Sequence, residues 1–181
     1  MPRANDSRQR MLISAATLMA QRGVGATGLR EVAEHAGVSR GSISHHFPGG
    51  KAEMVGDAVR LAGSAAAATI ADSKDTASAI DSICDIYRAA LEHSDFRAAC
   101  PVGALAAEAQ ADPDLTAAAA GVFEEWRVRL VELLEAEGTA DPVAAADLAI
   151  ASVEGALLLC RVQRSVEPLE HVRDGLHRAL A

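Results

Sequence analysis

The 181-residue sequence has very few aromatic residues, since phenylalanine, tryptophan and tyrosine together make up 3% of it. Hydrophobic residues nevertheless make up 50%, and many of them are alanine, the best helix former. Strands favour aromatic and β-branched residues, so this composition argues against sheets. It predicts an all-α protein that is long enough to bury a substantial core.

Cysteine is also scarce, with three widely spaced residues and no CxxC pair. This spacing indicates neither a disulfide framework nor a zinc site. The adjacent His45 and His46 project about 100° apart on a helix, which is poor geometry for one metal ion. We therefore expect neither a metal nor a cofactor.

The sequence also lacks a recognisable targeting segment. Its first residues lead into a polar helix rather than the apolar core of a signal peptide. The most apolar stretch, 144–160, is interrupted by Asp147 and Glu154 and falls short of the ~20 apolar residues of a membrane span. These features predict a cytoplasmic protein with no membrane partner.

Apolar residues at helical spacing predict about nine helices. We expect them at 7–22, 29–36, 39–47, 51–72, 75–94, 102–110, 114–137, 141–164 and 168–180.

Residues 26–47 have the pattern of two short helices joined by a tight turn. An apolar stripe lies on one face of 29–36, Gly37 suits the left-handed end of that helix, and Ser39 is a candidate N-cap. In the second segment Ile43 and Phe47 share a face, so the small, polar and cationic residues between them point outward. This is the pattern of a helix-turn-helix that reads DNA.

The outward residues of the second segment are expected to contact DNA, and Thr27 and Lys51 to contact its phosphates. The expected DNA-binding residues are Thr27, Ser39, Arg40, Gly41, Ser42, Ser44, His45, His46 and Lys51. Charge is divided accordingly, because residues 1–51 hold 7 Lys and Arg against 3 Asp and Glu, whereas 52–181 hold 10 against 22. Only the N-terminal part is therefore expected to face nucleic acid.

These residues carry a family resemblance. Residues 8–60 resemble the DNA-binding domain of TetR-family transcriptional regulators, through Thr27, 29–33, 36–43, 45–47 and Lys51. Further signals resemble the LmrA/YxaF-like branch; they are Phe47-Pro48-Gly49-Gly50-Lys51, Cys100-Pro101-Val102-Gly103, Trp126, Glu154-Gly155-Ala156 and Pro168-Leu169. Ser44 departs from the pattern, because many members have a tyrosine there that contacts phosphate, so that role is not carried over.

The resemblance implies a DNA-binding domain at 1–50, with three helices, and an effector-binding and dimerisation domain at 51–181. It also implies a one-component sensor, by default a repressor, whose affinity for operator DNA falls when a small, largely apolar or aromatic effector binds. Some relatives of this branch respond to drugs or plant phenolics, which suggests a similar class of effector.

The few large side chains of the second domain lie among alanines, an arrangement suited to an apolar effector pocket. The expected lining residues are Ile83, Tyr87, Phe96, Cys100, Leu105, Phe123, Trp126 and Leu130. Polar contacts are expected from Tyr87, His93 or Glu108. Core packing of a small bundle explains the same residues without a ligand, and stays open as the alternative.

Segment 141–164 is apolar on two faces, one with Leu148, Ala151, Gly155 and Leu159, the other with Ile150, Val153 and Leu157. A helix apolar nearly all round is buried on all sides, so we expect a second subunit to cover it together with 168–180. The expected interface residues are Ile150, Val153, Leu157, Arg161, Leu169, Val172 and Leu176. A homodimer would place two recognition helices about 34 Å apart on a palindromic operator; a monomer with a buried central helix is the alternative.

Three other functions are considered from the sequence. Residues 23–28 spell GxGxxG, but helix-forming residues rather than a strand precede them, which argues against a dinucleotide site. A small helical enzyme would use Cys100 as nucleophile, His93 as base and Asp95 beside it, but would leave the helix-turn-helix unexplained. A DNA-binding protein without an effector would lack a cavity behind Trp126. The sequence favours a regulator that is not an enzyme.

Overall fold

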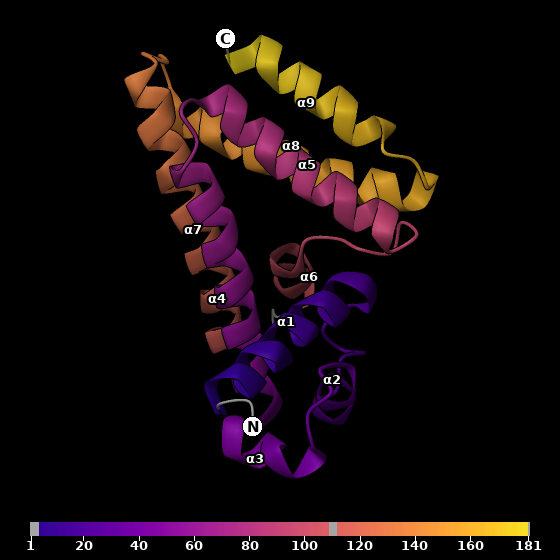
Figure 1. The fold of residues 1–181 in the computed structure, drawn as a ribbon. Coiled ribbons are helices and arrows are strands. Elements are labelled where there is room, and N and C mark those ends of the chain that lie inside the picture. The colour runs from indigo at the N-terminus through magenta and orange to yellow at the C-terminus, as the bar shows by residue number, and fades with distance from the viewer. Residues whose placement is uncertain (1–3, 109–111, 181) are drawn as a thin grey trace. The chain divides into compact units, whose positions relative to one another are not determined.

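The structure, a computed structural model, describes residues 4–108 and 112–180. Over these residues it contains α-helices and one short 3₁₀ turn but no strand, as Figure 1 shows. The elements are α1 (Ala4–Arg22), α2 (Leu29–His35), a 3₁₀ turn (Arg40–Ser42), α3 (Ile43–His46), α4 (Gly50–Ala71), α5 (Thr76–His93), α6 (Pro101–Glu108), α7 (Pro113–Ala136), α8 (Pro142–Gln163) and α9 (Glu167–Leu180). The all-α prediction is confirmed, and the nine α-helices of the described residues follow the expected order.

The chain groups into two compact units. Unit 1 comprises residues 1–63 and 101–122, and unit 2 comprises 64–100 and 123–181. The sequence-based division placed everything after residue 50 in one domain. In the structure α6 and the first part of α7 group instead with the helix-turn-helix.

Unit 1 is built around fully buried side chains of α1, α2 and α4, among them Met11, Val32 and Met54. Arg8 ties the end of the helix-turn-helix to this core. Its guanidinium lies 5.1 Å from the centre of the buried Phe47 ring and forms an ion pair with Asp57 of α4. Arg8 thus holds α1, Phe47 and α4 in one arrangement, through cation–π attraction and charge.

In unit 2, α8 packs on α9, and both pack on α5 (Figure 1). Two ion pairs and one close contact between a histidine and a carboxylate join α5 to α9, one turn apart along each helix. Arg88 pairs with Glu170, Asp85 lies 3.2 Å from Arg173, and Asp81 lies 3.0 Å from His177. This ladder fixes how α9 sits along α5.

The two faces of α8 have different surroundings. Its buried face packs inside unit 2 and comprises Ala145, Ala146, Ala149, Val153, Ala156, Leu157 and Cys160. Its other face exposes large apolar side chains, namely Val143, Leu148, Leu158, Leu159 and Val162. By length and composition alone α8 is apolar enough to cross a membrane, contrary to the expectation from its two acidic residues. Core helices of bundles have the same composition, and α8 packs along α9 as such a helix does.

Candidate DNA-binding surface and effector pocket

The turn between α2 and the second segment of the helix-turn-helix has the geometry that the sequence predicts. Gly37 has a φ of +63°, the left-handed conformation that only glycine adopts without cost. Its N–H donates to the Glu34 carbonyl at 3.1 Å, and the Val38 N–H donates to the Ala33 carbonyl at 2.9 Å. This pair of bonds is a Schellman motif, which ends α2 and sets the direction of the following segment.

The second segment is shorter than predicted, because a 3₁₀ turn followed by the four-residue α3 replaces one helix over 39–47. Gly41 and the neighbouring serines are poor helix formers, and Pro48 disfavours helical geometry at Phe47. Ser39 lies at the N-cap position as expected. Its hydroxyl, however, hydrogen-bonds the Ser42 hydroxyl at 2.8 Å instead of capping a backbone N–H.

Most predicted DNA contacts lie together on this segment. Ser39, Arg40, Gly41, Ser44 and His45 are exposed, and Ser42, His46 and Lys51 are half-buried. The Arg40 side chain is 67% exposed and forms an ion pair with Glu34 of α2. Because exposed pairs of this kind contribute little to stability, Arg40 can exchange Glu34 for another acceptor at small cost.

Lys51 lies in the first turn of α4, as predicted, and its Nζ donates to the Gly25 carbonyl at 3.1 Å. Thr27 lies differently from the expectation. Its side chain is fully buried, and its hydroxyl donates to the Gly23 carbonyl at 2.8 Å. Thr27 therefore shapes the loop before α2 rather than presenting its hydroxyl to a phosphate, and we no longer count it among the contacts.

The same loop is held by a residue that sequence reasoning assigned elsewhere. The Glu108 carboxylate, at the end of α6, accepts from the Val24 N–H at 3.1 Å and from the Gly25 N–H at 2.7 Å. Gly23 has a φ of +84°, which strains any other residue, and a Cβ there would also lie 2.3 Å from Glu108 Oε1 and push this carboxylate aside. Glu108 belongs to unit 1 and does not line the pocket described next, contrary to its expected role in effector binding.

A pocket lies wholly within unit 2, with a cavity volume of about 50 Å³. Four of its lining residues were predicted from the sequence, namely Ile83, Tyr87, Trp126 and Leu130. The others are Ala66, Ile70, Ala79, Ile80, Ala149, Ile150, Val153 and Glu154. Ile150 and Val153 had been assigned to the dimer interface, because periodicity cannot tell a face turned to a cavity from one turned to a partner.

The remaining residues predicted for the pocket do not line it. Phe123 packs edge-on against Trp126, with ring centres 5.4 Å apart. Phe96 lies under the Arg164 guanidinium, 5.9 Å from it. Leu105 is fully buried on α6, in unit 1. Each of these large side chains packs in a protein interior or against a neighbour, as the core-packing alternative would have it.

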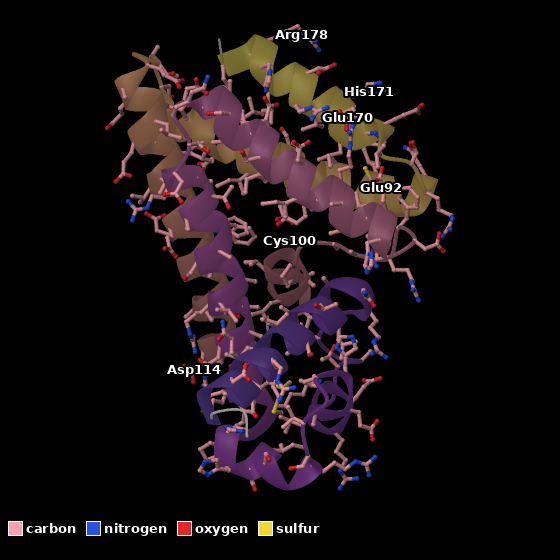
Figure 2. The ribbon with its side chains drawn as sticks, viewed as in Figure 1. Glu92, Cys100, Asp114, Glu170, His171 and Arg178 are labelled. Carbon is pink, nitrogen blue, oxygen red and sulfur yellow. The ribbon has the colours of Figure 1, made fainter. Side chains whose placement is uncertain are left out.

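Cys100, labelled in Figure 2, is buried directly before α6 and joins two residues of the pocket wall. Side-chain hydrogen bonds connect it to Tyr87 of α5 and to Glu154 of α8. Burial raises the pKa of the Tyr87 phenol well above its ordinary value. Burial also raises the pKa of Glu154, a shift that the bond to Cys100 partly offsets. In the sequence Glu154 stands out as an acidic residue inside an apolar helix. Only the structure shows which residues surround it.

The structure does not assemble a nucleophilic site from Cys100, His93 and Asp95. Cys100 is 1% exposed and bonded to Tyr87 and Glu154, whereas His93 is exposed. Asp95 pairs with Arg164, at 2.6 Å. No cluster of three metal-ligating side chains occurs within residues 4–108 and 112–180.

The residues predicted for the dimer interface are largely buried within unit 2 itself. Val153, Leu157, Leu169 and Leu176 are at most 9% exposed. Arg161 and Val172 are half-buried. The face of α8 that remains available is the other apolar face, which includes Leu148 and Leu159.

Comparisons with known proteins find matches both for the helix-turn-helix and for the part of the chain that holds the pocket. Residues 12–58 match the family model described as bacterial regulatory proteins, tetR family, and residues 76–175 match the model for the C-terminal domain of LmrA/YxaF-like transcriptional regulators. An uncharacterised HTH-type transcriptional regulator of Mycobacterium tuberculosis is 38% identical, over 96% of this chain and 93% of its own length. The HTH-type transcriptional regulator LmrA of Bacillus subtilis is 29% identical, over 92% of this chain and 93% of its own length.

Solved structures show the same fold. The regulatory protein TetR from Rhodobacter sphaeroides superposes with a TM-score of 0.83 at 24% identity, covering 95% of this chain and 97% of that one. The family indicated by the helix-turn-helix residues is also the family of the matching models and of the relatives, which span nearly the whole chain. The chain belongs to the TetR family of bacterial transcriptional regulators, in its LmrA/YxaF-like branch, and is a DNA-binding regulator rather than an enzyme.

Proposed function

We propose that the protein is a repressor that binds a palindromic operator as a homodimer and is released by a small, largely apolar effector. The observation that carries the proposal is the exposed segment from Ser39 to His46, where Arg40 and small polar side chains face outward from the turn that follows α2. Small side chains allow the backbone to approach the base edges, and Arg40 can donate two hydrogen bonds to guanine.

Phosphate contacts would come from both ends of this surface. Lys51 and the N-terminal end of α4 offer a cation and the positive end of a helix dipole, a combination that attracts phosphate. The N–H groups of Gly49 and Gly50 are already bonded, to Glu53 and to the Phe47 carbonyl, so the dipole and Lys51 carry this contact. His45 of α3 is exposed as well. Because residues 52–181 carry 22 acidic against 10 basic residues, the rest of the chain is expected to stay away from the duplex.

The exposed apolar face of α8 supports the dimer. Leu158 and Val162 are 61% and 85% exposed, together with the neighbouring Leu148 and Leu159. Contiguous apolar surface of this kind marks protein interfaces. When two copies of the chain pair about a two-fold axis, the exposed face of each α8 covers that of the other. We assign a second copy of this chain as the partner that covers this face, since a palindromic operator has two half-sites and each needs its own DNA-binding surface.

The dimer proposal is tested by light scattering after size-exclusion chromatography. Leu159→Glu places a charge in the middle of the proposed interface and is expected to give monomers. Val128→Glu is the matched control, because Val128 is a 43% exposed valine of α7 outside this face. A dimeric L159E variant, or a wild-type monomer at micromolar concentration, would contradict the proposal.

The pocket of unit 2 supports an effector. Its volume of about 50 Å³ is below the 300–1,000 Å³ of sites that hold drug-sized ligands, so binding must displace side chains of its wall. Tyr87 and Glu154 lie in that wall and bond Cys100, which directly precedes α6. At its other end α6 carries Glu108, which holds the loop before α2. We infer that α6 conveys the displacement to the helix-turn-helix.

A coupling of ~1–3 kcal/mol between the two sites changes operator affinity by about 5- to 150-fold. The test is a DNase footprint on the DNA that flanks the protein's own gene, followed by titration of the complex with candidate effectors. A protected palindrome and a loss of protection with effector are expected. Operator affinity that no pocket ligand alters would favour the alternative, a DNA-binding protein that responds to no effector.

A further inference from the structure

The residues with the most strained backbone meet at one place in unit 2. Among the residues that the structure describes, three other than glycine have a positive φ, namely Asp95 at +55°, Phe96 at +57° and Arg164 at +52°. The Arg164 guanidinium pairs with the Asp95 carboxylate at 2.6 Å and lies 5.9 Å from the centre of the Phe96 ring. Asp95 and Arg164 are 69 positions apart in the sequence. Three residues whose left-handed backbone costs free energy therefore hold one another through their side chains.

Two helices end at this place without glycine. Asp95 directly follows the C-cap of α5, and Arg164 is the C-cap of α8. The Asp95 N–H donates to the Glu92 carbonyl at 3.2 Å, and the Phe96 N–H donates to the Leu91 carbonyl at 2.7 Å. These two bonds form a Schellman motif, in which glycine is the usual left-handed residue because it has no Cβ. A turn made of other residues persists only where its surroundings hold it.

The same turn begins the connection between α5 and α6. Only residues 97–99 separate Phe96 from Cys100, which is 1% exposed and directly precedes α6. The Ser94 hydroxyl accepts from the Ala98 N–H at 2.8 Å and donates to the Leu91 carbonyl at 3.1 Å, so the connection is folded back on the end of α5. A change in the turn therefore reaches Cys100 through a short piece of backbone.

The contact that holds the turn is itself exposed. The side chains of Arg164 and Asp95 are 59% and 72% exposed. Because exposed ion pairs are weak, this pair offsets the backbone strain only by a small margin. Salt narrows the margin further, since it screens charges that are in contact with solvent. Such a balance suits a contact that opens and closes.

We propose that these residues form a latch, in which Arg164 holds the turn at Asp95 and Phe96 closed. The closed latch keeps Cys100 buried; when the ion pair breaks, the strained residues leave the left-handed conformation and the connection opens. Because Glu108 of α6 holds the loop before α2, the open latch lowers operator affinity. This last step rests on the coupling through α6 proposed above, whereas the latch itself does not.

The chain carries its own reporter of the latch, because Cys100 lies in the connection and is buried. Full-length protein is treated with N-ethylmaleimide in native buffer, and mass spectrometry gives the labelling rate of each cysteine. Arg164→Gln removes the ion pair and is expected to raise the Cys100 rate at least about tenfold, through local opening. Cys84, buried in the middle of α5, is the internal control whose rate should not change.

A second variant removes the same ion pair from the other side. Asp95→Asn keeps a residue that tolerates the left-handed conformation, and it is expected to raise the Cys100 rate by a similar factor. The double variant with R164Q should add nothing further, since both changes remove one interaction. Arg129→Gln is the matched control, because Arg129 pairs with Glu132 at the surface of its own helix, and it should leave the Cys100 rate unchanged.

Salt provides a readout that a general loss of stability would not reproduce. In the wild type the Cys100 rate should rise severalfold between low and high salt, because screening weakens the ion pair. In R164Q the rate should already be high at low salt and should change little. A wild-type rate that does not depend on salt would contradict the latch.

The remaining outcomes separate the latch from the coupling to DNA. A Cys100 rate in R164Q equal to the wild-type rate, or a rise that Cys84 shares to the same degree, would overturn the latch. Circular dichroism checks folding, and if R164Q does not fold, D95N decides in its place. A raised Cys100 rate with a severalfold loss of operator affinity, measured by fluorescence anisotropy, would support both steps. A raised rate with unchanged operator affinity would leave the latch standing and refute the coupling through α6.

Discussion

Glu108 and Gly25 are joined by a hydrogen bond of 2.7 Å in which the carboxylate accepts from the backbone N–H, and the Val24 N–H donates to the same side chain at 3.1 Å. One side chain of α6 thereby satisfies two N–H groups of the loop that leads into α2. Since Lys51 donates to the carbonyl of the same Gly25, this loop links α6 with the first turn of α4. The orientation of the helix-turn-helix therefore depends on a residue 83 positions away in the sequence.

Glu108→Ala is expected to loosen the loop before α2. Loss of two hydrogen bonds to a charged acceptor should lower the free energy of unfolding by roughly 1–3 kcal/mol and weaken operator binding. Thermal unfolding and fluorescence anisotropy with operator DNA measure the two effects. The control is Glu135→Gln, an exposed carboxylate of α7. Operator affinity and stability equal to the wild type in E108A would refute the role of this contact.

Glu34→Gln is expected to strengthen DNA binding severalfold at low salt. The change removes the partner of Arg40 and a negative charge beside the DNA-binding surface, so the guanidinium is free to engage the duplex. Anisotropy titrations at several salt concentrations measure the affinity. Glu31→Gln is the control, because Glu31 pairs with Arg22 rather than with a predicted DNA contact. Weaker binding by E34Q would show that Glu34 instead orients Arg40 productively.

Glu170→Gln is expected to destabilise unit 2. Glu170 pairs with Arg88 of α5 and with Arg173 of its own helix, so its loss leaves two partly buried guanidinium groups without their shared carboxylate. The expected loss in the free energy of unfolding is roughly 1 kcal/mol, since the pairs are partly screened by solvent. Denaturant unfolding measures it, against Glu132→Gln, whose pair with Arg129 lies within one helix. An equal loss of stability in both variants would contradict the claim that Glu170 stabilises unit 2 by joining α5 to α9.

Stability should depend on pH through Glu154. Because burial raises its pKa in the folded protein, the folded state holds this proton more tightly than the unfolded chain and is penalised at neutral pH. Glu154→Gln is therefore expected to raise the melting temperature at pH 7. The gain should shrink as the pH falls through the raised pKa of the folded state and vanish below the unfolded-state pKa of glutamate, where both states are protonated. Cys100 is hydrogen-bonded to Glu154 and to Tyr87, and burial raises the pKa of the Tyr87 phenol, so that Tyr87 stays neutral over this range. A gain that does not change with pH would contradict this account.

Cys84 is expected to react slowly with thiol reagents. Burial raises the pKa of its thiol to about 11, so that at pH 8 only about one molecule in a thousand carries the reactive thiolate. Mass spectrometry after iodoacetamide treatment, in native buffer and in denaturant, compares the rates. Rapid native labelling of Cys84 would indicate that α5 opens in solution.

The sequence predicts the helices well because their signals are local. Gly37 ends α2 with the expected left-handed conformation, and α4 begins one residue before the expected Lys51. Periodicity also finds which helices are apolar. It cannot assign each face to a neighbour, and for this reason Val153 and Leu157 were placed at a partner surface although they pack inside unit 2.

The candidate sites were predicted in part for the same reason. The exposure of the residues around Arg40 can be predicted from the pattern of one short segment. Thr27, in contrast, is buried within a loop that is held by Glu108, a residue far away in the sequence. Glu108 and Glu154 acquire their roles only through contacts across the fold. Such contacts, between residues far apart in the chain, are what a single sequence does not display.

The central claim is that the surface around Arg40 and Ser42 binds operator DNA. The most direct measurement is anisotropy of the DNA that flanks the protein's own gene, titrated with the wild type and with the double variant Arg40→Ala, Ser42→Ala over a range of salt concentrations. The account predicts tight wild-type binding that weakens steeply as salt rises, and a loss of at least about tenfold in the variant. Equal affinities, or no binding by the wild type at low salt, would contradict it.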